Sequence, residues 1–261
     1  MILDEIAAKT LQRVVEAKKG KPDSVLRAEA EALPRNGSFP FEEALNGSFA
    51  FICEVKKASP SKGIIAADFP YLKIAKDYEA AGASAVSVLT EPHYFLGSDK
   101  YLEEIAQTVG IPVLRKDFTV DAYQIYEAKC LGASAVLLIC ALLDMEKLAE
   151  FIRVADSLGL SVLVEAHDET EVDSALRARA RVIGVNNRNL KDFTVDIQNS
   201  IRLRAAVPQD ILMIAESGIQ TAEDIRALRD AGINGVLIGE TLMRSPDKKA
   251  ALDLLRGACH E

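Results

Sequence analysis

The sequence lacks the features that place a protein in a membrane or on the secretory route. No apolar run approaches the roughly 18 residues that a membrane-spanning helix needs. The first residues, Met1 to Glu5, carry neither the basic start nor the apolar stretch of a signal peptide. We therefore expect a cytoplasmic protein that has no membrane partner.

Cysteine and histidine are scarce, at four and three residues. The cysteines, at positions 53, 130, 140 and 259, form no Cys-x-x-Cys pair, and no histidine stands at the spacing of a metal ligand. Cys53 and Cys140 lie in apolar runs, which indicates buried thiols in a reducing compartment. The sequence therefore predicts reduced cysteines and no metal site.

Positive charge is also in short supply, since 39 acidic residues against 31 basic ones give a formal net charge of −8. An acidic chain is a poor partner for nucleic acid or for an anionic membrane. No strand-like run is followed by Gly-x-Gly-x-x-Gly or by a P-loop, which argues against a dinucleotide-binding open sheet. The chain has ample material for a hydrophobic core, because 49% of its 261 residues are hydrophobic. This length suits one large α/β domain.

From residue 49 onward, apolar strand-like runs alternate with helical patterns such as residues 71–78 and 145–152. Three units share a glycine, at positions 82, 132 and 232, where a helix ends and the next strand begins. This repeat predicts parallel strands in a closed (β/α)₈ TIM barrel, with a doubly wound open sheet as the rival. The expected strands are 49–56, 85–89, 112–116, 135–140, 161–165, 182–186, 211–215 and 235–239.

Residues 1–48 precede the repeat and show helical spacing of their own. The first helix begins at Ile2 and stops near Gly20, and two shorter ones cover about 25–33 and 41–45. We expect an N-terminal helical extension that docks on a single barrel domain spanning residues 1–261.

Polar side chains follow the strand-like runs, at the end of the barrel where such folds carry their chemistry. Glu54 and Lys56 share one face of the first strand because alternate residues of a strand point the same way. Burying this pair is costly without a purpose, although a structural ion pair is the alternative for this segment alone. His167 is expected to flank the site. By the same alternation, the inward-facing set comprises Glu54, Lys56, Lys116, Glu165, Asn186 and Glu216, which can shift one another's pKa values.

The last two strand ends have a separate character, because each runs from strand through glycine into a helix N-terminus. Backbone N–H groups exposed at such a place bind phosphate, and barrels often put this site after strands seven and eight. The alternative is that these glycines serve only tight turns. A small phosphorylated molecule is the expected ligand, and the residues expected to contact it are Ser59, Arg188, Ser217, Gly218, Gly239 and Glu240.

Several of these segments resemble the indole-3-glycerol-phosphate synthase family of tryptophan biosynthesis, and the resemblance covers essentially the whole chain. The most specific segments are residues 54–63, EVKKASPSKG, and residues 183–190, IGVNNRNL. Residues 112–118, 164–167 and 215–219 also match, and Glu240 stands where some members have Ser. The resemblance implies a carboxy-lyase that needs no cofactor or metal. Its reaction closes the ring of 1-(2-carboxyphenylamino)-1-deoxyribulose 5-phosphate, with loss of carbon dioxide and water, to give indole-3-glycerol phosphate.

The resemblance also implies roles for individual residues. Lys116 would protonate the substrate ketone, and we expect its neighbours Leu114 and Phe118 to lower its pKa by desolvation. Lys56 would pair with the substrate carboxylate. The remaining roles are proton handling by Glu165 and Glu54, whose order stays open, orientation of the intermediate by Asn186, substrate contact by Glu216, and an apolar wall made by Phe118, Leu137 and Leu190.

Two alternatives remain open at this point. Another phosphate-binding barrel enzyme, such as a sugar-phosphate isomerase or a Schiff-base aldolase, would share the glycine-bearing strand ends. A non-catalytic sensor of a phosphorylated metabolite would share them too. We expect a monomer in either case.

Overall fold

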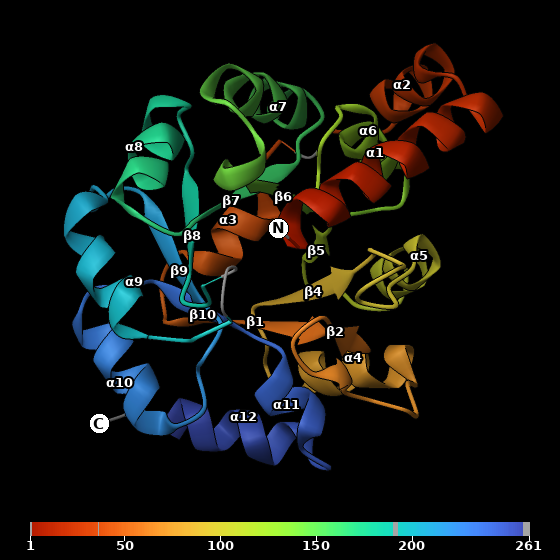
Figure 1. Ribbon diagram of the computed structural model, residues 1–261. Helices are drawn as coiled ribbons and strands as arrows, with labels where there is room; N and C mark the ends of the chain where they lie inside the picture. Colours follow the sequence, from red (N-terminus) through yellow and green to blue (C-terminus); the bar gives the residue numbers. More distant parts are fainter. Residues whose placement is uncertain (1, 36, 190–192, 258–261) are drawn as a thin grey trace.

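The computed structural model describes residues 2–35, 37–189 and 193–257 (Figure 1). In this part of the chain, eight parallel strands close into a barrel, and β1 completes it by pairing with β10. The closure rules out the open sheet and confirms the predicted barrel. The strands are β1 Ala50–Val55, β4 Ala85–Leu89, β5 Val113–Lys116, β6 Ala135–Ile139, β7 Ser161–Ala166, β8 Val182–Asn186, β9 Leu212–Glu216 and β10 Gly235–Ile238.

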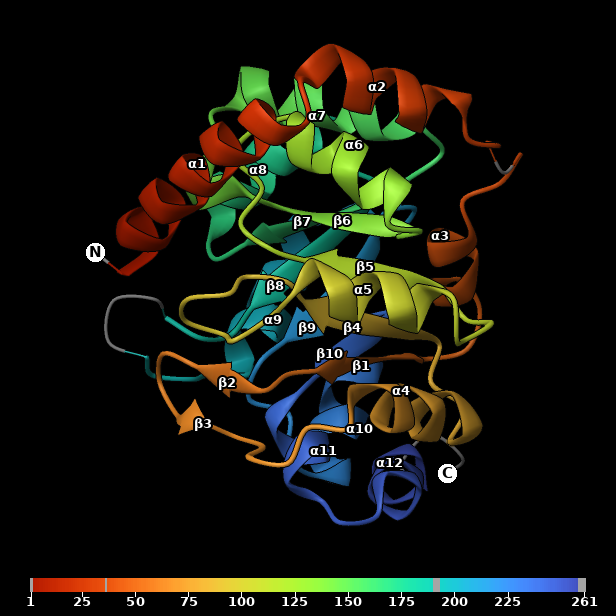
Figure 2. The same cartoon turned by 90° about the vertical axis from the view of Figure 1, so that its right-hand side faces the viewer.

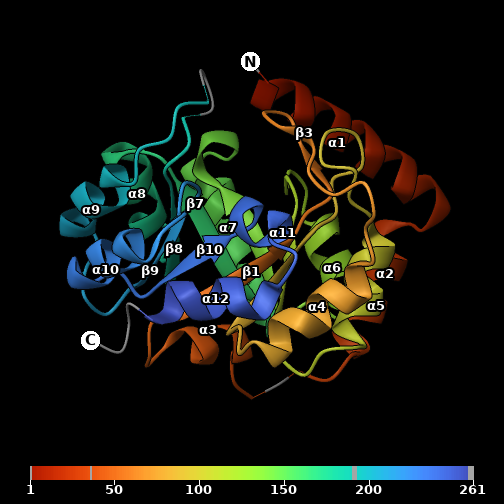
Figure 3. The ribbon, with the colours of Figure 1, turned by 90° about the horizontal axis from the view of Figure 1, so that it is seen from below.

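Helices surround the barrel, and the last of them, α12, packs beside α4, so that the ring of helices is closed (Figure 3). None of the helices in the described ranges is long and apolar enough to cross a membrane. The outer elements are α4 Tyr71–Ala80, α5 Asp99–Ala106, α6 Tyr123–Cys130, η1 Cys140–Leu142, α7 Met145–Ser157, α8 Glu169–Arg177, α9 Gln198–Leu203, η2 Arg204–Ala206, α10 Ala222–Asp230, α11 Glu240–Arg244 and α12 Lys248–Gly257.

The repeated glycines end their helices as predicted. Gly82, Gly132 and Gly232 all adopt left-handed backbone angles, with φ of 82°, 83° and 82°. The next residue then bonds back into the helix, as Ala83 N does to Tyr78 O at 3.0 Å. This arrangement satisfies the last carbonyl groups of the helix and turns the chain directly into the next strand.

Strand alternation separates two cores. Ile52, Leu114 and Leu163 belong to the cluster inside the barrel, whereas Phe51 and Cys53 belong to the larger cluster between the strands and the helices. Burial raises the pKa of the Cys53 thiol to about 12, so this cysteine is an unreactive core residue. The inward face therefore alternates as the sequence indicated, which positions the polar residues that follow at the strand ends.

The N-terminal extension occupies three different places rather than forming one cap. It comprises α1 Ile2–Gly20, α2 Asp23–Ala32 and α3 Pro40–Leu45. The start of α1 lies at one end of the barrel and α3 at the other, while α2 packs along α6 (Figure 2). Phe41 and Leu45 of α3 are buried in the interior cluster, because they close the end of the barrel at which the strands begin.

A short hairpin follows β1. Its strands, β2 Ala58–Ser59 and β3 Gly63–Ile64, pair in antiparallel fashion. The hairpin lies at the same end of the barrel as the start of α1 (Figure 2). It thereby holds Ser59, Ser61 and Lys62 over the mouth of the barrel.

Candidate active site

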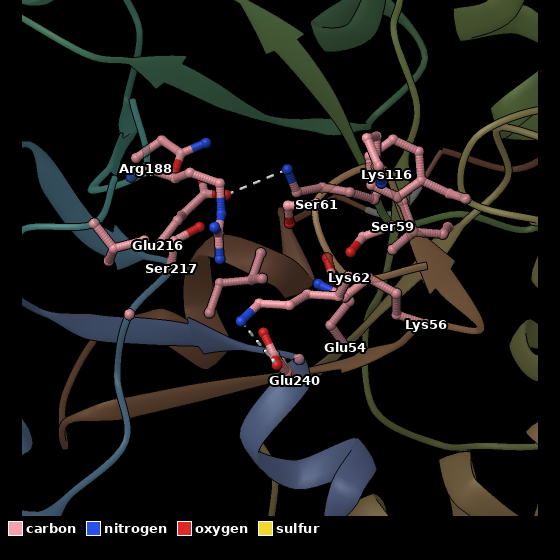
Figure 4. Close-up of a pocket in the computed structure, with 18 of the residues that line it drawn as sticks. Glu54, Lys56, Ser59, Ser61, Lys62, Lys116, Arg188, Glu216, Ser217 and Glu240 are labelled. Carbon is pink, nitrogen blue, oxygen red and sulfur yellow. Dashed lines mark hydrogen bonds and ion pairs between the residues drawn. The ribbon is translucent and has the colours of Figure 1, made fainter. Parts of the chain in front are cut away.

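A cavity of about 630 Å³ opens at the end of the barrel where the strands finish. The labelled side chains come from opposite sides of this mouth and converge on it (Figure 4). Leu190, expected in the apolar wall, lies outside the described residues. The other predicted site residues all line the cavity: Glu54, Lys56, Ser59, Lys116, Phe118, Leu137, Glu165, Asn186, Arg188, Glu216, Ser217, Gly218, Gly239 and Glu240.

Lys116, at the end of β5, contacts two carboxylates from other strands of the barrel, β7 and β9. Its Nζ atom is 3.1 Å from Glu165 Oε2 and 3.2 Å from Glu216 Oε2. Asn186 Nδ2 donates to the other oxygen of Glu165 at 3.3 Å. Four strands thus deliver one ammonium group, two carboxylates and one amide to a single buried cluster.

The expectation that desolvation lowers the pKa of Lys116 is wrong. Burial does disfavour the charge, but the carboxylates of Glu165, Glu216 and Glu54 outweigh it and raise the pKa of Lys116. These carboxylates lie on other strands. The prediction considered only Leu114 and Phe118, the neighbours of Lys116 on its own strand face, and so could not include their effect. Lys116 is therefore fully protonated in the free protein at neutral pH.

The two carboxylates on Lys116 differ in character. Burial alone would raise the pKa of Glu165, but Lys116, His167 and the Asn186 amide hold it below its ordinary value. Burial raises the pKa of Glu216 to about 7, since the attraction of Lys116 is opposed by the charge of Glu165. Glu165 is therefore ionised, while Glu216 carries a proton in part of the molecules near neutral pH.

Glu216 also has an unused acceptor. Its Oε1 atom is buried and has no hydrogen-bond partner among the described residues. The atom occupies space that Gly184 leaves open, because a Cβ at this position would overlap it. Although the sequence placed Glu216 with the substrate-binding residues, its contact in the free protein is with Lys116.

Lys56 and Glu54 form a second pair on β1 and the residues directly after it. Lys56 Nζ lies 2.5 Å from Glu54 Oε2, and the side chain of Lys56 is 18% exposed against 5% for that of Glu54. Gly239 makes room for the pair, since an added Cβ would overlap Glu54 Oε2 and stand 2.9 Å from Lys56 Nζ. The second lysine is thus held by Glu54 and faces the cavity.

The glycine-bearing ends of β9 and β10 form another side of the cavity, next to β1. Ser217 and Gly218 have consecutive left-handed backbone angles, with φ of 67° and 82°. Successive backbone N–H groups in a turn can point to one side and form an anion-binding nest. A Cβ at Gly218 would overlap the side chain of Val195, so this position requires glycine for both conformation and space.

Sequence reasoning missed several residues of the cavity. Ile2, Leu3 and Ile6 of α1 line it, and so does Phe95, whose ring centroid is 5.9 Å from that of Phe118. A strand-end search could not find α1, because the helix reaches the site through docking alone. Phe95 follows the second barrel strand and is a large apolar residue in a polar loop, which was the available signal.

Glu240 has cations on both sides. Lys62 Nζ is 3.7 Å and Arg244 Nε is 3.0 Å from Glu240 Oε1, and the pair with Lys62 is visible in Figure 4. These partners offset the negative charge of Glu240 next to the anticipated phosphate site.

Some polar strand ends are structural. Arg115 faces away from the cavity and is buried against Asp99 and Glu127, with Nη2 at 2.8 Å and 2.6 Å from their oxygens. Asp117 accepts from Arg13 of α1 at 2.6 Å, which fastens α1 to the end of β5. Polar residues at strand ends therefore include both the site and the framework behind it.

In the described ranges, no group of three or more His, Cys, Asp or Glu could hold a metal ion.

Comparisons with known structures support the fold. The chain superimposes on 3-hexulose-6-phosphate synthase from Salmonella typhimurium with a TM-score of 0.67, 14% identity, and coverage of 81% of this chain and 98% of that one. The thiamine phosphate pyrophosphorylase of Pyrococcus furiosus gives a TM-score of 0.61 and 15% identity, with coverage of 82% and 96%. At such low identity these similarities concern the barrel alone.

Comparisons with known sequences are far more specific. The family model described as indole-3-glycerol phosphate synthase matches residues 3–255. The indole-3-glycerol phosphate synthase of Ruminiclostridium cellulolyticum is 62% identical over 259 residues, which is 99% of this chain and 100% of that protein. The protein of the same name from Endomicrobium trichonymphae is 54% identical, with coverage of 94% of this chain and 95% of the relative. The chain therefore belongs to the indole-3-glycerol phosphate synthase family.

Proposed function

We propose that the protein converts 1-(2-carboxyphenylamino)-1-deoxyribulose 5-phosphate to indole-3-glycerol phosphate, carbon dioxide and water. The observation that carries the proposal is the cluster in which Lys116 contacts Glu165 and Glu216 beneath a partly apolar cavity. This cluster combines a charged proton donor with an ionised acceptor, and ring closure followed by dehydration needs both.

The cavity has walls suited to the two ends of such a substrate. Phe118 and Leu137 provide apolar surface for the aromatic ring, and the backbone at Ser217 and Gly218 supports the phosphate. Lys56 is then available for the carboxylate on the ring. Fixing both ends brings the ring carbon that carries the carboxylate close to the ketone, which lowers the entropic cost of ring closure.

Ring closure forms a bond from this ring carbon to the ketone carbon, and the ketone oxygen becomes an alkoxide. We assign the proton that it takes up to Lys116. The raised pKa of Lys116 keeps the proton in place until the alkoxide, a much stronger base than an amine, develops beside it. Loss of carbon dioxide then returns the bonding electrons to the ring.

Dehydration removes the new hydroxyl group and one proton from the carbon next to the nitrogen, which completes the indole. We assign the proton to Glu165, because its lowered pKa marks it as the ionised carboxylate of the cluster. Lys56 lies beside Glu54 and is placed to assist the departing hydroxyl once the substrate carboxylate has left. Asn186, which donates to Glu165, would orient the intermediate.

The electrostatics of the site disfavour the aldolase alternative. A Schiff-base enzyme needs a neutral lysine, and such enzymes lower its pKa through desolvation or a nearby cation. Here two carboxylates raise the pKa of Lys116, and Lys56 is paired with Glu54. Borohydride added with a ketose phosphate is therefore expected to trap no covalent adduct.

The phosphate site is tested by comparing two glycines with the same backbone angle. We expect Gly218→Ala to raise both KM and the inhibition constant of inorganic phosphate, because the added Cβ distorts the backbone that faces the anion. Gly232→Ala is the matched control: its φ is also 82°, its Cβ would have nothing within 4 Å, and it lies in a turn outside the cavity lining. Both variants bear a left-handed alanine, at about 1–2 kcal/mol. Equal kinetics in the two variants, or no competition by phosphate in the wild type, would refute the assignment.

The reaction itself is tested with substrate labelled in the carboxylate carbon. The proposal requires release of the label as carbon dioxide in step with substrate consumption. Consumption of substrate with the label retained would point to a different barrel chemistry.

The free thiols Cys53, Cys130 and Cys140 fit a reducing compartment, and we propose a cytoplasmic location on that ground.

A further inference from the structure

His167 lies directly after β7 and does not line the cavity, yet its ring faces the carboxylate that does. Its Nε2 atom is 3.5 Å from Glu165 Oε1, and its Nδ1 atom is 3.0 Å from Glu171 Oε2. Nε2 is buried and has no hydrogen-bond partner within ordinary length among the described residues. The imidazole therefore stands between two carboxylates, one in the site and one on α8.

The fold fixes the ring in this orientation. Glu171 Oε2 also accepts from the backbone N–H of His167 at 2.7 Å, while Asp168 caps α8 by accepting from Glu171 N at 3.0 Å. Asn199 Nδ2 donates to the carbonyl of His167 at 3.1 Å. The side chain of His167 is 17% exposed, so little room remains for another rotamer.

The two neighbours decide the protonation state. A neutral imidazole has one N–H, so one of its nitrogens would turn a lone pair towards a carboxylate. Only the imidazolium presents a hydrogen to both Glu165 and Glu171. Consistent with this, burial opposes the charge, but the hydrogen bond that His167 donates to Glu171 and the charges of Glu165 and Glu216 outweigh burial and raise the pKa of His167.

We infer that His167 is a positioning residue, whose imidazolium is oriented by Glu171 and keeps the Glu165 carboxylate ionised and correctly directed for proton transfer. The inference rests on the proposed function. During ring closure Lys116 gives up its proton and its charge, and Glu165 then loses the cation that had held it ionised. The imidazolium on the other oxygen of Glu165 remains, so that Glu165 is still an acceptor when dehydration begins.

Other groups around His167 do not compete with this role. Cys140 of η1 contacts the backbone of α8 through Glu171 O and has a pKa raised by burial to about 12, so it stays neutral. The charged or titratable groups that face or adjoin His167 are Glu165 of β7, Glu171 of α8, Glu216 of β9, Asp168 and Cys140, with Lys116 of β5 on Glu165 Oε2.

The kinetic test is the pH profile of kcat/KM for wild type, His167→Gln and Glu171→Gln. An opposite charge within about 4–6 Å lowers a carboxyl pKa by about 1–3 units, so removing the imidazolium raises that of Glu165. We expect the acid limb of the profile to move to higher pH by about 1 unit in His167→Gln. The loss of activity should be largest at the low-pH end of the profile, where Glu165 becomes protonated, and small near pH 8. Glu171→Gln keeps the acceptor for the backbone and should give a smaller shift in the same direction.

His93→Gln is the control, because His93 is an exposed histidine outside the lining of the active-site cavity. It should leave the profile unchanged. A uniform loss at every pH in His167→Gln, or a lower melting temperature with an unmoved acid limb, would show a purely structural histidine and overturn the inference.

A second readout needs no turnover. The chain has three histidines, so the imidazole C–H signals can be titrated by NMR and assigned with the Gln variants. Coupling between two sites is reciprocal, so Glu165→Gln should lower the pKa of His167 by as much as His167→Gln raises that of Glu165. An unchanged His167 titration in folded Glu165→Gln would contradict the inference. This measurement separates the two claims, since an inactive wild type would refute the proposed function and leave the titration decisive for His167.

Discussion

Replacement of Lys116 by Met should lower kcat by about 10²–10⁴-fold, the usual contribution of one positioned general acid. KM should change little, because Lys116 is held by Glu165 and Glu216 in the free protein and acts on a group that becomes basic only during the reaction. Lys56→Met, by contrast, removes the proposed partner of the substrate carboxylate, so it should raise KM as well. Steady-state kinetics of the two variants separate these roles.

A charge-preserving variant refines this test. Lys116→Arg keeps a cation between the two carboxylates, but a guanidinium holds its proton too tightly to donate it. If Lys116 is the acid of ring closure, Lys116→Arg should be nearly as slow as Lys116→Met. Recovery of most of the activity by Arg would mean that Lys116 acts through its charge alone, and near-normal turnover in Lys116→Met would show that the two lysines are misassigned.

The largest effect on stability is expected at Arg115. Its side chain is 1% exposed and contacts Asp99, Glu127 and Asp117, while Nη1 donates to Gln124 O at 2.9 Å. Arg115→Met leaves these acceptors without their cation, and breaking a buried pair in this way costs about 3–5 kcal/mol. For a domain of this size the melting temperature should fall by roughly 6–20 °C, as measured by calorimetry.

Arg13→Met is the control for this prediction. Arg13 contacts the same network through Asp117 but is 23% exposed, and Asp117 keeps the Thr90 hydroxyl at 2.6 Å. The melting temperature should therefore fall much less, whereas KM should rise because α1 is loosened at the rim. Equal losses of stability in the two variants would contradict the view that Arg115 is the centre of the network.

The barrel could be predicted from the sequence because it depends on local patterns. Apolar runs of strand length and left-handed glycines such as Gly82 are visible within a few residues, and they gave all eight strands nearly at their true bounds. Strand parity then placed Glu54, Lys116 and Glu165 on the inside without knowledge of the three-dimensional structure. The same residues carried the resemblance to the family.

What the sequence did not reveal depends on contacts between distant segments. The pKa of Lys116 is set by Glu165, 49 residues away, and not by its neighbours on β5. The burial of α3 inside the end of the barrel and the contact of Arg13 with Asp117 likewise arise only on folding. For this reason residues 1–48 were predicted to form one extension, although its three helices stabilise three separate regions of the barrel.

The most direct test of the proposed reaction is the fluorescence of purified protein mixed with 1-(2-carboxyphenylamino)-1-deoxyribulose 5-phosphate. The chain has no tryptophan, so any indole emission comes from the product. We expect indole emission to rise until one indole has formed for each substrate molecule consumed, and to rise about 10²–10⁴-fold more slowly with Lys116→Met. Binding of the substrate without any indole formed would contradict the account.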